Sequence, residues 1–479
     1  MSDDRFDREL GQRLRAYESR IPDAEAPLPA AAGDRRPPWA WLIGVGALGI
    51  VAAGMLVLVL VNSPRSDVGE SSPSPIPTAS PAATTSAAPS APSSPPASSS
   101  PSASTQPEPT AASADLTWTE TGSFGTDAGA GVVNDLVAHA GGLIAVGTEY
   151  EHRLPVLGPA PPRDGRVWGS ADGRSWTDRT PDGTFDDVQL RHVYEASDGT
   201  LVAIGTRMAE SDGQETFTHL AWESTDGVTW RDAAIDLPDG SQVNAIERGA
   251  QGYLAWLVPM GATHGSEIWF SPDGRAWERV RSLVGGAVAI GAGGEGFVVS
   301  GSQGPDFETV EPFTIASSDG REWFEASNPP PGASGVLPIG GDWIVIAHEI
   351  GDGSLPDHAS VWHSTNGLDW SAHGELPLES VEVEGARCTE VPAGAGAAGG
   401  WLVAATSLAY PCSEGGFVVH GSQRISTDGA AWTALPLDAS TPGEQGSGSN
   451  VRAAATFDGR LILVGEANLK ATFWIGEAP

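Results

Sequence analysis

Charged and polar side chains recur near the beginnings of short apolar runs in the C-terminal three quarters of the chain. The candidate binding residues of this kind are Asp135, Arg191, His192, Asn244, Arg248, Arg387 and Arg452. The guanidinium group of arginine forms paired hydrogen bonds with carboxylates and phosphates, so this set favours recognition of an anionic group. The alternative is that these side chains only line a solvated funnel that binds no ligand.

Motifs for covalent, metal or cofactor chemistry are missing from the sequence. It contains no nucleophile elbow, no phosphate-binding glycine loop and no paired-cysteine motif. The histidines have no partner at metal-ligand spacing within one repeat unit. We therefore expect no metal and no cofactor, and we name no catalytic residue. Cys388 and Cys412 are the only cysteines, and on the oxidising side of a membrane we expect them to form a disulfide.

A seven-residue box, Ser-X-Asp-Gly-X-X-Trp, recurs six times and sets the organisation of the region. The polar and aromatic residues of this repeat are Asp172, Asp226, Asp273, Asp319, Asn366 and Asp428, with Trp176, Trp230, Trp277, Trp323, Trp370 and Trp432. By subtraction, successive box tryptophans are 54, 47, 46, 47 and 62 residues apart. A recurring unit of this length is typical of a repeat architecture.

Each repeat unit predicts four short antiparallel strands. An apolar dipeptide such as Val167-Trp168 precedes the box, and a glycine-led apolar run such as 141–147 lies further upstream. Four such strands make one blade of a β-propeller. Residues 116–120 look like a strand that follows a box, whereas the chain after Trp432 supplies three strands and no box. Pairing the first strand with the last three would close the ring, so we expect an all-β, seven-bladed propeller over residues 116–479.

The box has a physical explanation that requires no catalysis. Asp-Gly between two apolar runs is a strong hairpin signal, because glycine accepts positive φ and aspartate binds nearby backbone N–H groups. The serine hydroxyl can satisfy a further amide of the turn. The tryptophan falls on the next strand, where we expect it to fill the gap between neighbouring blades. Packing and turn formation therefore account for the box.

Tight and long connections are expected on opposite faces of the propeller. The glycine-led turns and the box turns are short, whereas the loops 149–166, 208–219, 303–311, 347–359 and 408–421 are long and irregular. Insertions confined to one face of a repeat array usually mark the binding face. The innermost strands begin on that face, and they would bring the candidate residues toward the mouth of the central channel.

The boxes resemble the Asp-box, or BNR, repeats of sialidase-like bacterial propellers, over residues 116–479. The usual Asp-box has one residue between Asp and Gly, and here the two are adjacent in all six copies. The resemblance implies a propeller, and its sialidase members need an arginine cluster, a tyrosine nucleophile paired with a glutamate, and an acidic residue. Arg153-Leu154-Pro155 lies in a loop rather than on an opening strand, and no tyrosine occurs in the closing blade. We therefore favour a non-enzymatic binding module, with a sialidase-type glycoside hydrolase as the alternative.

The N-terminal quarter predicts a membrane anchor. Residues 39–61 contain no charge and are long enough, at about 1.5 Å per residue, to cross a hydrocarbon core of about 30 Å. Arg35 and Arg36 directly precede this segment, which predicts a cytoplasmic N-terminus and an extracytoplasmic propeller. Residues 62–115 are rich in Ser, Pro, Ala and Thr and predict a disordered stalk.

The cytoplasmic tail, residues 1–38, predicts an amphipathic helix. Phe6, Leu10, Leu14, Tyr17 and Ile21 are spaced by three or four residues, which forms one apolar stripe. Such a helix either lies on lipid headgroups or docks a cytoplasmic protein. Because the stretch 7–22 looks like the start of bacterial anti-sigma-type membrane proteins, a sigma factor is one candidate partner.

The charge of the chain bounds its partners. Of the formal charge of −35, residues 116–479 carry −31, which is 49 acidic minus 18 basic residues. So acidic a surface repels nucleic acid, and we expect none as a partner. The sequence therefore predicts a single-pass membrane protein whose propeller binds an extracytoplasmic protein or glycan and signals to a cytoplasmic partner.

Overall fold

The computed structural model describes the chain in stretches between residues 116 and 478. The described residues are 116–125, 130–150, 163–211, 214–259, 265–284, 288–304, 311–348, 358–383, 386–408, 422–437 and 449–478. The predicted tail (1–38), transmembrane segment (39–61) and stalk (62–115) lie outside these residues, as do Cys412 and the side chain of Cys388. These parts of the sequence analysis, including the disulfide, stay predictions. Among the described residues, no helix is long and apolar enough to span a membrane.

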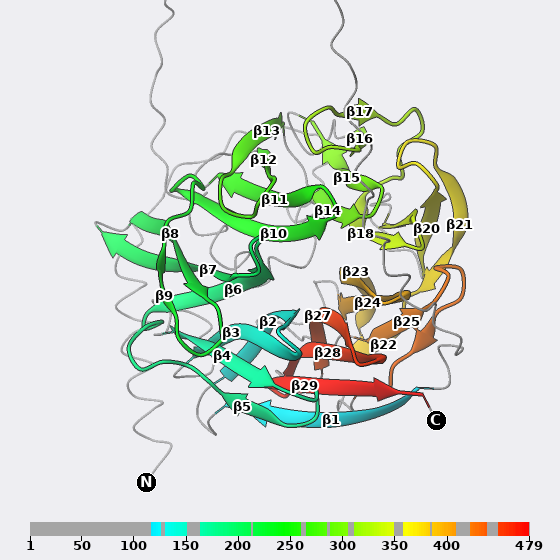
Figure 1. Ribbon diagram of the computed structural model, residues 1–479. Helices are drawn as coiled ribbons and strands as arrows, with labels where there is room; N and C mark the ends of the chain where they lie inside the picture. Colours follow the sequence, from blue (N-terminus) through cyan, green and yellow to red (C-terminus); the bar gives the residue numbers. More distant parts are fainter. Residues whose placement is uncertain are drawn as a thin grey trace, which may run out of the picture. The chain divides into compact units, whose positions relative to one another are not determined.

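Within the described residues, the strands pair into seven antiparallel sheets, each of which is one blade (Figure 1). Blade 1 contains β2 (Ala130–His139), β3 (Gly142–Tyr150), β4 (Arg163–Ser170) and β5 (Trp176–Asp178). Blade 2 contains β6 (Val188–Glu195), β7 (Leu201–Ser211), β8 (Gln214–Ser224) and β9 (Arg231–Ala233). Blade 3 contains β10 (Ser241–Gly249), β11 (Gly252–Pro259), β12 (Ser266–Ser271) and β13 (Glu278–Leu283).

The remaining four blades continue the same order. Blade 4 contains β14 (Val288–Gly293), β15 (Gly296–Gln303), β16 (Glu311–Ser317) and β17 (Phe324–Glu325). Blade 5 contains β18 (Ala333–Ile339), β19 (Asp342–Ala347), β20 (His358–Ser364) and β21 (Ser371–Pro377). Blade 6 contains β22 (Ser380–Val383), β23 (Ala386–Ala398), β24 (Trp401–Leu408), β25 (Gln423–Ser426) and β26 (Thr433–Ala434). Blade 7 contains β27 (Ser449–Phe457), β28 (Arg460–Ala467), β29 (Lys470–Glu477) and β1 (Thr117–Phe124).

The blades form a closed ring. The innermost strands β2, β6, β10, β14, β18, β23 and β27 each lie against the next one, and β27 lies against β2 (Figure 1). Blade 7 joins the two ends of the propeller, because β1 pairs antiparallel with β29, with Trp118 opposite Gly476 and Glu120 opposite Trp474. Figure 1 shows β1, in cyan, beside β29, in red. The predictions of seven blades and of closure by the first strand are both confirmed.

Hydrophobic side chains from neighbouring blades pack together to form the core. Trp230, which follows β8 of blade 2, lies in one buried cluster with Ile144 and Val167 of blade 1. Trp176 of blade 1 stacks on Phe473 of blade 7, with ring centroids 4.1 Å apart and planes inclined by 23°. The box tryptophan therefore fills the interface between blades, as its position in the repeat predicts.

The six box turns, one in each of blades 1 to 6, are held by the same hydrogen bonds. In the second box, Oδ1 of Asp226 accepts the backbone N–H groups of Val228 at 2.9 Å and Thr229 at 2.7 Å. The Ser224 hydroxyl accepts the Gly227 N–H at 2.9 Å and donates to Asp226 Oδ1 at 3.0 Å. These backbone bonds lower the pKa of Asp226 to about 2, because they favour the ionised carboxylate.

Glycine is required in the box for two reasons. Gly227 has a φ of +67°, a conformation that side-chain-bearing residues rarely adopt. A Cβ atom at this position would also meet Ile144 Cδ1 of blade 1 at 2.3 Å. The turn therefore presses its backbone against the preceding blade, which couples the hairpin to the interface between blades.

Two parts of the ring differ from the predicted pattern. The residues 208–219 are not an irregular loop, because β7 and β8 continue as one hairpin up to Ser211, which pairs with Gln214. Blade 6 has a fifth strand, since β22 pairs with the first residues of the long strand β23. In both places strand pairing satisfies backbone groups that an irregular loop would leave to solvent.

Candidate functional site

The innermost strands share an irregularity that places side chains at one end of the ring. In six of the seven, a β-bulge leaves one residue without a partner on the next strand, at a matching point of each blade. These bulge residues are Asn134, Arg191, Asn244, Ser334, Ala393 and Arg452. A bulge bends its strand and redirects a side chain. Two of the six residues are arginines, and they lie in blades 2 and 7, on either side of blade 1.

Arg163 and Arg191 share one hydrogen-bond acceptor. Arg163, the first residue of β4, donates from Nη1 to Oε1 of Gln189 at 3.2 Å. Arg191 donates from Nη2 to the same oxygen at 3.0 Å. The Gln189 amide in turn donates from Nε2 to the Tyr150 hydroxyl at 3.4 Å, and Tyr150 lies directly opposite Arg163 in the β3–β4 pair. One buried amide thus holds two guanidinium groups and a phenol together.

Arg452 is paired with Glu466, the single carboxylate of the site among the described residues. Its Nη2 lies 3.5 Å from Oε1 of Glu466, and the same oxygen accepts a hydrogen bond from Asn450 Nδ2 at 3.3 Å. Asn450 and Glu466 lie directly opposite each other on β27 and β28. The three arginines therefore come from three neighbouring blades, with Arg163 on blade 1, Arg191 on blade 2 and Arg452 on blade 7. We call Arg163, Arg191 and Arg452 the arginine cluster.

Arg163 and its supports Tyr150 and Gln189 are buried, and Arg191 and Arg452 are partly buried. Arg163 is 6% exposed and Tyr150 and Gln189 are each 5% exposed, whereas the Arg452 side chain retains 17%. Nε of Arg191 and Nε of Arg452 are also buried, and neither has a hydrogen-bond partner within the described residues. Buried N–H donors without a partner are costly and rare, so they call for an explanation.

The charges of the cluster act on one another. The pKa of Arg191 is lowered to about 10, mainly because burial disfavours its charge, and further because Arg163 and Arg452 repel it. The pKa of Tyr150 is raised, since burial disfavours the phenolate more than the neighbouring arginines favour it. At neutral pH Arg191 is therefore charged and Tyr150 is protonated.

The remaining predicted binding residues lie at different levels of the ring. Asp135 accepts the backbone N–H groups of Leu136 at 2.7 Å and Val193 at 2.9 Å, and its Oδ2 lies 3.8 Å from Nδ1 of His192. His192 is neutral, because burial lowers its pKa to about 4. These two residues connect the inner strands of blades 1 and 2, and they follow the bulges rather than occupy them.

Arg248 lies near the opposite end of its strand from the bulge. Its Nη1 is 3.7 Å from Glu195, and its guanidinium lies 5.7 Å from the centre of the Tyr253 ring. It is next to the tight turn between β10 and β11, so the structure does not bring it to the arginine cluster. Asn244 occupies the bulge of blade 3. Arg387 lies on β23, but its side chain is outside the described residues.

The sequence analysis missed the residues that complete the site. Tyr150, Arg163, Gln189, Asn450 and Glu466 were not candidates, because Tyr150 and Arg163 fell within the predicted loop 149–166 and the other three belong to no motif. The available signal was the alternation in 163–170, where Arg163, Gly165 and Val167 are buried along one face of β4. Recognising that alternation would have extended β4 back to Arg163, opposite Tyr150.

The site lies on the face of the propeller opposite the boxes. β3 runs from Leu143, which pairs with Ser170 of the first box, to Tyr150, which pairs with Arg163. Tyr150 lies seven residues after Leu143, so at about 3.3 Å per residue the two ends of β3 are roughly 23 Å apart. The tight turns are at the box end, and the 151–162 connection is at the arginine end.

No group of three or more His, Cys, Asp or Glu residues among the described ones is arranged to hold a metal ion. An anion, rather than a metal or a metal-dependent cofactor, is the species that the arrangement of donors suits. Among the residues that the structure describes, the hydrogen-bond donors of the site outnumber its acceptors, and its charged groups are three guanidinium ions and one carboxylate.

Comparison with known proteins identifies no family. No protein-family model and no curated protein matches the chain. Among solved structures, it is similar to the β-propeller domain of the trilobed protease from Pyrococcus furiosus, at 8% identity over 73% of this chain and 96% of that chain, with a TM-score of 0.42. It is also similar to the acylaminoacyl peptidase of Pyrococcus horikoshii, at 10% identity over 70% of this chain and 49% of that chain (TM-score 0.40), so it spans about half of that protein.

A third similar structure is the α-L-arabinanase of Penicillium chrysogenum complexed with arabinobiose, at 13% identity over 60% of this chain and 92% of that chain, with a TM-score of 0.34. Similarities at this level carry no information on the activity of this chain.

Proposed function

We propose that this protein is a membrane-anchored binding module whose propeller recognises an anionic ligand at the arginine cluster. The observation that carries the proposal is the meeting of Arg163, Arg191 and Arg452 with one carboxylate, Glu466, in a mostly buried site. Within the described residues, no carboxylate lies within ion-pair distance of Arg163 or Arg191. A buried charge without a counter-ion destabilises the fold, so a function that requires it is the simplest reason for its presence.

The geometry supports an anion that enters from the face opposite the boxes. Tyr150 accepts a hydrogen bond from Gln189, which leaves its own O–H group available to donate to a ligand. The unpartnered Nε groups of Arg191 and Arg452 are further donors. Charge-assisted hydrogen bonds of this kind are stronger than neutral ones, and they are not cancelled by solvent in a buried site.

A glycoside hydrolase of sialidase type is the second candidate function. The meeting of an arginine cluster with Tyr150 favours it, because those are the groups that such enzymes use. However, burial raises the pKa of Tyr150, which opposes its action as a nucleophile. Glu466 forms its polar contacts with Arg452 and Asn450 rather than with Tyr150. We therefore favour binding over hydrolysis. That the boxes are related to Asp-box repeats is a further part of the proposal.

Attachment to the membrane is also part of the proposal. The uncharged segment 39–61 would anchor the chain, with the propeller held outside the cell by the stalk 62–115 and the tail 1–38 in the cytoplasm. A signal to a cytoplasmic partner such as a sigma factor would then depend on the apolar stripe of the tail. Pull-down with residues 1–38 tests this step, and Leu10→Asp should abolish recovery of a protein partner.

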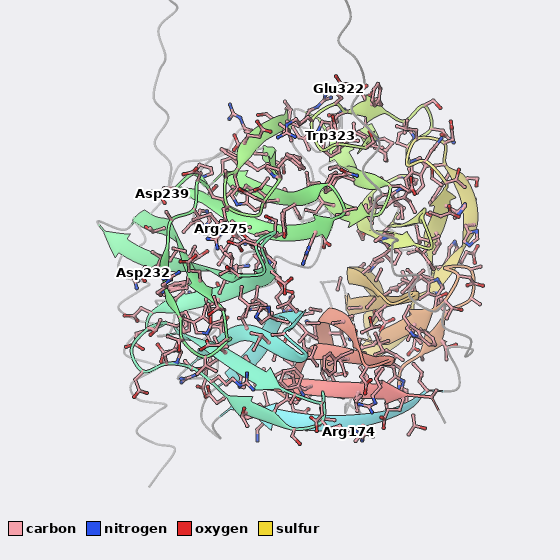
Figure 2. All side chains as sticks on the ribbon, in the orientation of Figure 1. Arg174, Asp232, Asp239, Arg275, Glu322 and Trp323 are labelled. Carbon is pink, nitrogen blue, oxygen red and sulfur yellow. The ribbon has the colours of Figure 1, made fainter. Side chains whose placement is uncertain are left out.

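The binding function is tested on an array of neutral, carboxylated and phosphorylated glycans with the labelled full-length chain. We expect retention on anionic glycans only, and an at least tenfold loss in the double variant Arg191→Ala/Arg452→Ala. Arg174→Ala is the matched control, because Arg174 lies in the first box, at the end of blade 1 opposite the cluster, and pairs there with Glu477 of blade 7 (Figure 2).

Three outcomes would contradict the proposal: retention on neutral glycans alone, no retention on any glycan, or an equal loss in the control variant. A fluorogenic sialoside panel tests the second candidate. Turnover that the Tyr150→Phe variant abolishes would replace binding by hydrolysis.

A further inference from the structure

The charges of the arginine cluster do not balance, and the excess has a defined size. Arg163, Arg191 and Arg452 contribute three positive charges, and Glu466 contributes one negative charge. The charged or ionisable groups that act on Arg191 are Tyr150, Arg163 and Arg452, and those that act on Tyr150 are the three arginines and Glu466. Because Tyr150 is neutral at pH 7, the described residues leave the site with an excess of two positive charges.

The hydrogen-bonding groups of the site are as one-sided as its charges. Oε1 of Gln189 is already shared by two arginines, and Oε1 of Glu466 by Arg452 and Asn450. Apart from Oε2 of Glu466, the groups that remain for a ligand within the described residues are donors: the Tyr150 hydroxyl and the unpartnered Nε groups of Arg191 and Arg452. Such a set suits a ligand that only accepts hydrogen bonds, and it does not suit a neutral sugar or a protonated acid.

We infer that the arginine cluster binds a terminal phosphomonoester, a group whose two negative charges and acceptor oxygens match the excess charge and the donors of the site. The inference rests on the proposed anion-binding function and names the ligand class for it. A single carboxylate or a sulfate ester would leave one buried guanidinium without a counter-charge. A phosphomonoester carries about −1.5 to −2 at pH 7, and arginine binds its oxygens in a paired geometry.

Gln189 is the positioning residue of this site. Its amide holds two like-charged guanidinium groups on one oxygen, a geometry that their mutual repulsion would otherwise open. Replacing the amide by a carboxylate, Gln189→Glu, keeps the shape of the side chain and adds one negative charge. The excess positive charge of the site would fall from two to one, so its preference for a dianion over a monoanion should also fall.

The test compares phenyl phosphate with phenyl sulfate by isothermal titration calorimetry on the purified full-length chain in phosphate-free buffer at pH 7.5. The two probes share a tetrahedral group and a ring, and they differ by one charge. We expect phenyl phosphate to bind at least tenfold more tightly to the wild-type chain. The Gln189→Glu variant should reduce this ratio to threefold or less, and Arg174→Ala should leave it unchanged.

The pH dependence gives a second readout that a merely structural role would not move. The second ionisation of a phosphomonoester has a pKa of about 6, so phenyl phosphate should bind more tightly at pH 7.5 than at pH 5.5. Phenyl sulfate keeps one charge over this range. The titratable groups around the cluster include Tyr150, Glu466, His192 and His219, and burial lowers the pKa of both histidines. Asp135, 3.8 Å from His192, has its pKa raised by burial to about 7, and its ionisation as pH rises would weaken the binding of both probes. An increase in affinity with pH that is confined to phenyl phosphate therefore reports ionisation of the ligand rather than of the protein.

Failure of this inference can be distinguished from failure of the proposed function. If benzoate or phenyl sulfate binds as tightly as phenyl phosphate, the site is an anion site without preference for a dianion, and the inference is wrong. If none of the three probes binds while Arg191→Ala/Arg452→Ala also leaves the glycan array unchanged, the proposed function itself fails. Glucose 6-phosphate and O-phosphoserine as further probes separate a sugar from an amino acid as the carrier of the phosphate.

Discussion

The box tryptophans provide a direct measure of how much the packing between blades stabilises the ring. Trp176 and Trp323 occupy the same position in the first and fourth boxes. Each donates its indole N–H to the carbonyl of the box glycine at 3.2 Å. They differ in packing, because Trp176 is 8% exposed and stacks on Phe473, whereas Trp323 is only half-buried (Figure 2). Replacing each by alanine therefore removes the same hydrogen bond but different amounts of apolar contact.

The expected loss of free energy of unfolding follows from the buried area. A fully buried tryptophan removes at most about 250 Å² from water, which at about 25 cal/mol per Å² corresponds to about 6 kcal/mol as an upper bound. Core Phe or Trp to Ala substitutions lose about 3–5 kcal/mol. We expect Trp176→Ala to lie in that range and Trp323→Ala to lose about half as much. The difference of about 2 kcal/mol is the contribution of the closer packing against the neighbouring blade.

The assay is unfolding of the purified chain in guanidinium chloride, followed by far-ultraviolet circular dichroism so that the readout does not depend on tryptophan fluorescence. The free energies of unfolding of the wild-type chain and both variants are compared with one common slope against denaturant concentration. Equal losses in the two variants, or a larger loss for Trp323→Ala, would refute the reasoning. In that case the box tryptophan would act mainly through its hydrogen bond to the turn.

Three further predictions concern the turns and the centre of the ring. Asp226→Asn should leave the free energy of unfolding nearly unchanged, because Asn366 forms the same turn bonds in the fifth box. Asp226→Ala should lower it by about 1–2 kcal/mol. Denaturant midpoints measure both effects, and a clearly destabilised Asn variant would contradict the prediction. Gly227→Ala should be more destabilising than Gly199→Ala. Both glycines have positive φ, but only at position 227 would the new Cβ meet a neighbouring blade. Equal melting temperatures of the two variants would show that this contact does not matter. Burial raises the pKa of Asp135 from 3.8 to about 7, so the folded chain retains a proton that the unfolded chain loses, and stability should fall as pH rises from 4 to 7. Asp135→Asn should flatten that part of the melting-temperature profile, and an unchanged slope would show that another group is responsible.

The repeat made the scaffold predictable from sequence. Six boxes with a period near fifty residues, together with the strand around Trp118 that has no box before it, were sufficient to predict seven blades and their closure. The physical reason is that each box combines a turn that Asp-Gly and Asn-Gly strongly favour with an aromatic side chain that packs between blades. In every box the local turn preference and the tertiary packing therefore favour the same structure. Such consistency between local and tertiary preferences is what allows a fold to be predicted from its sequence.

The site was only partly predictable because its residues obey no repeat. Arg191 and Arg452 were identified as polar side chains at the start of inner strands, but the bulges that redirect them leave no mark in the apolar pattern. Arg163 was assigned to a loop because the sequence does not reveal where β4 begins. Gln189 and Glu466 have no distinctive motif, and their importance depends on contacts with residues in other strands or blades. Contacts between distant residues are what a single sequence does not contain.

The bulges explain how a symmetric ring carries an asymmetric site. Six inner strands have the same extra residue, so the backbone offers six equivalent positions around the channel, yet their side chains differ: two asparagines, two arginines, a serine and an alanine. The two arginines flank blade 1, which supplies Arg163 from β4 rather than from its innermost strand. The proposed binding site is thereby displaced from the axis of the ring toward blades 7, 1 and 2. Because blade 7 is also the blade that β1 closes, a ligand held between Arg452 and Arg191 would connect the closing blade to blade 2 across blade 1. Ligand binding should therefore stabilise the closure of the ring, and phenyl phosphate should raise the melting temperature of the wild-type chain more than that of the Arg452→Ala variant. An equal rise in both chains would show that the ligand does not contact blade 7.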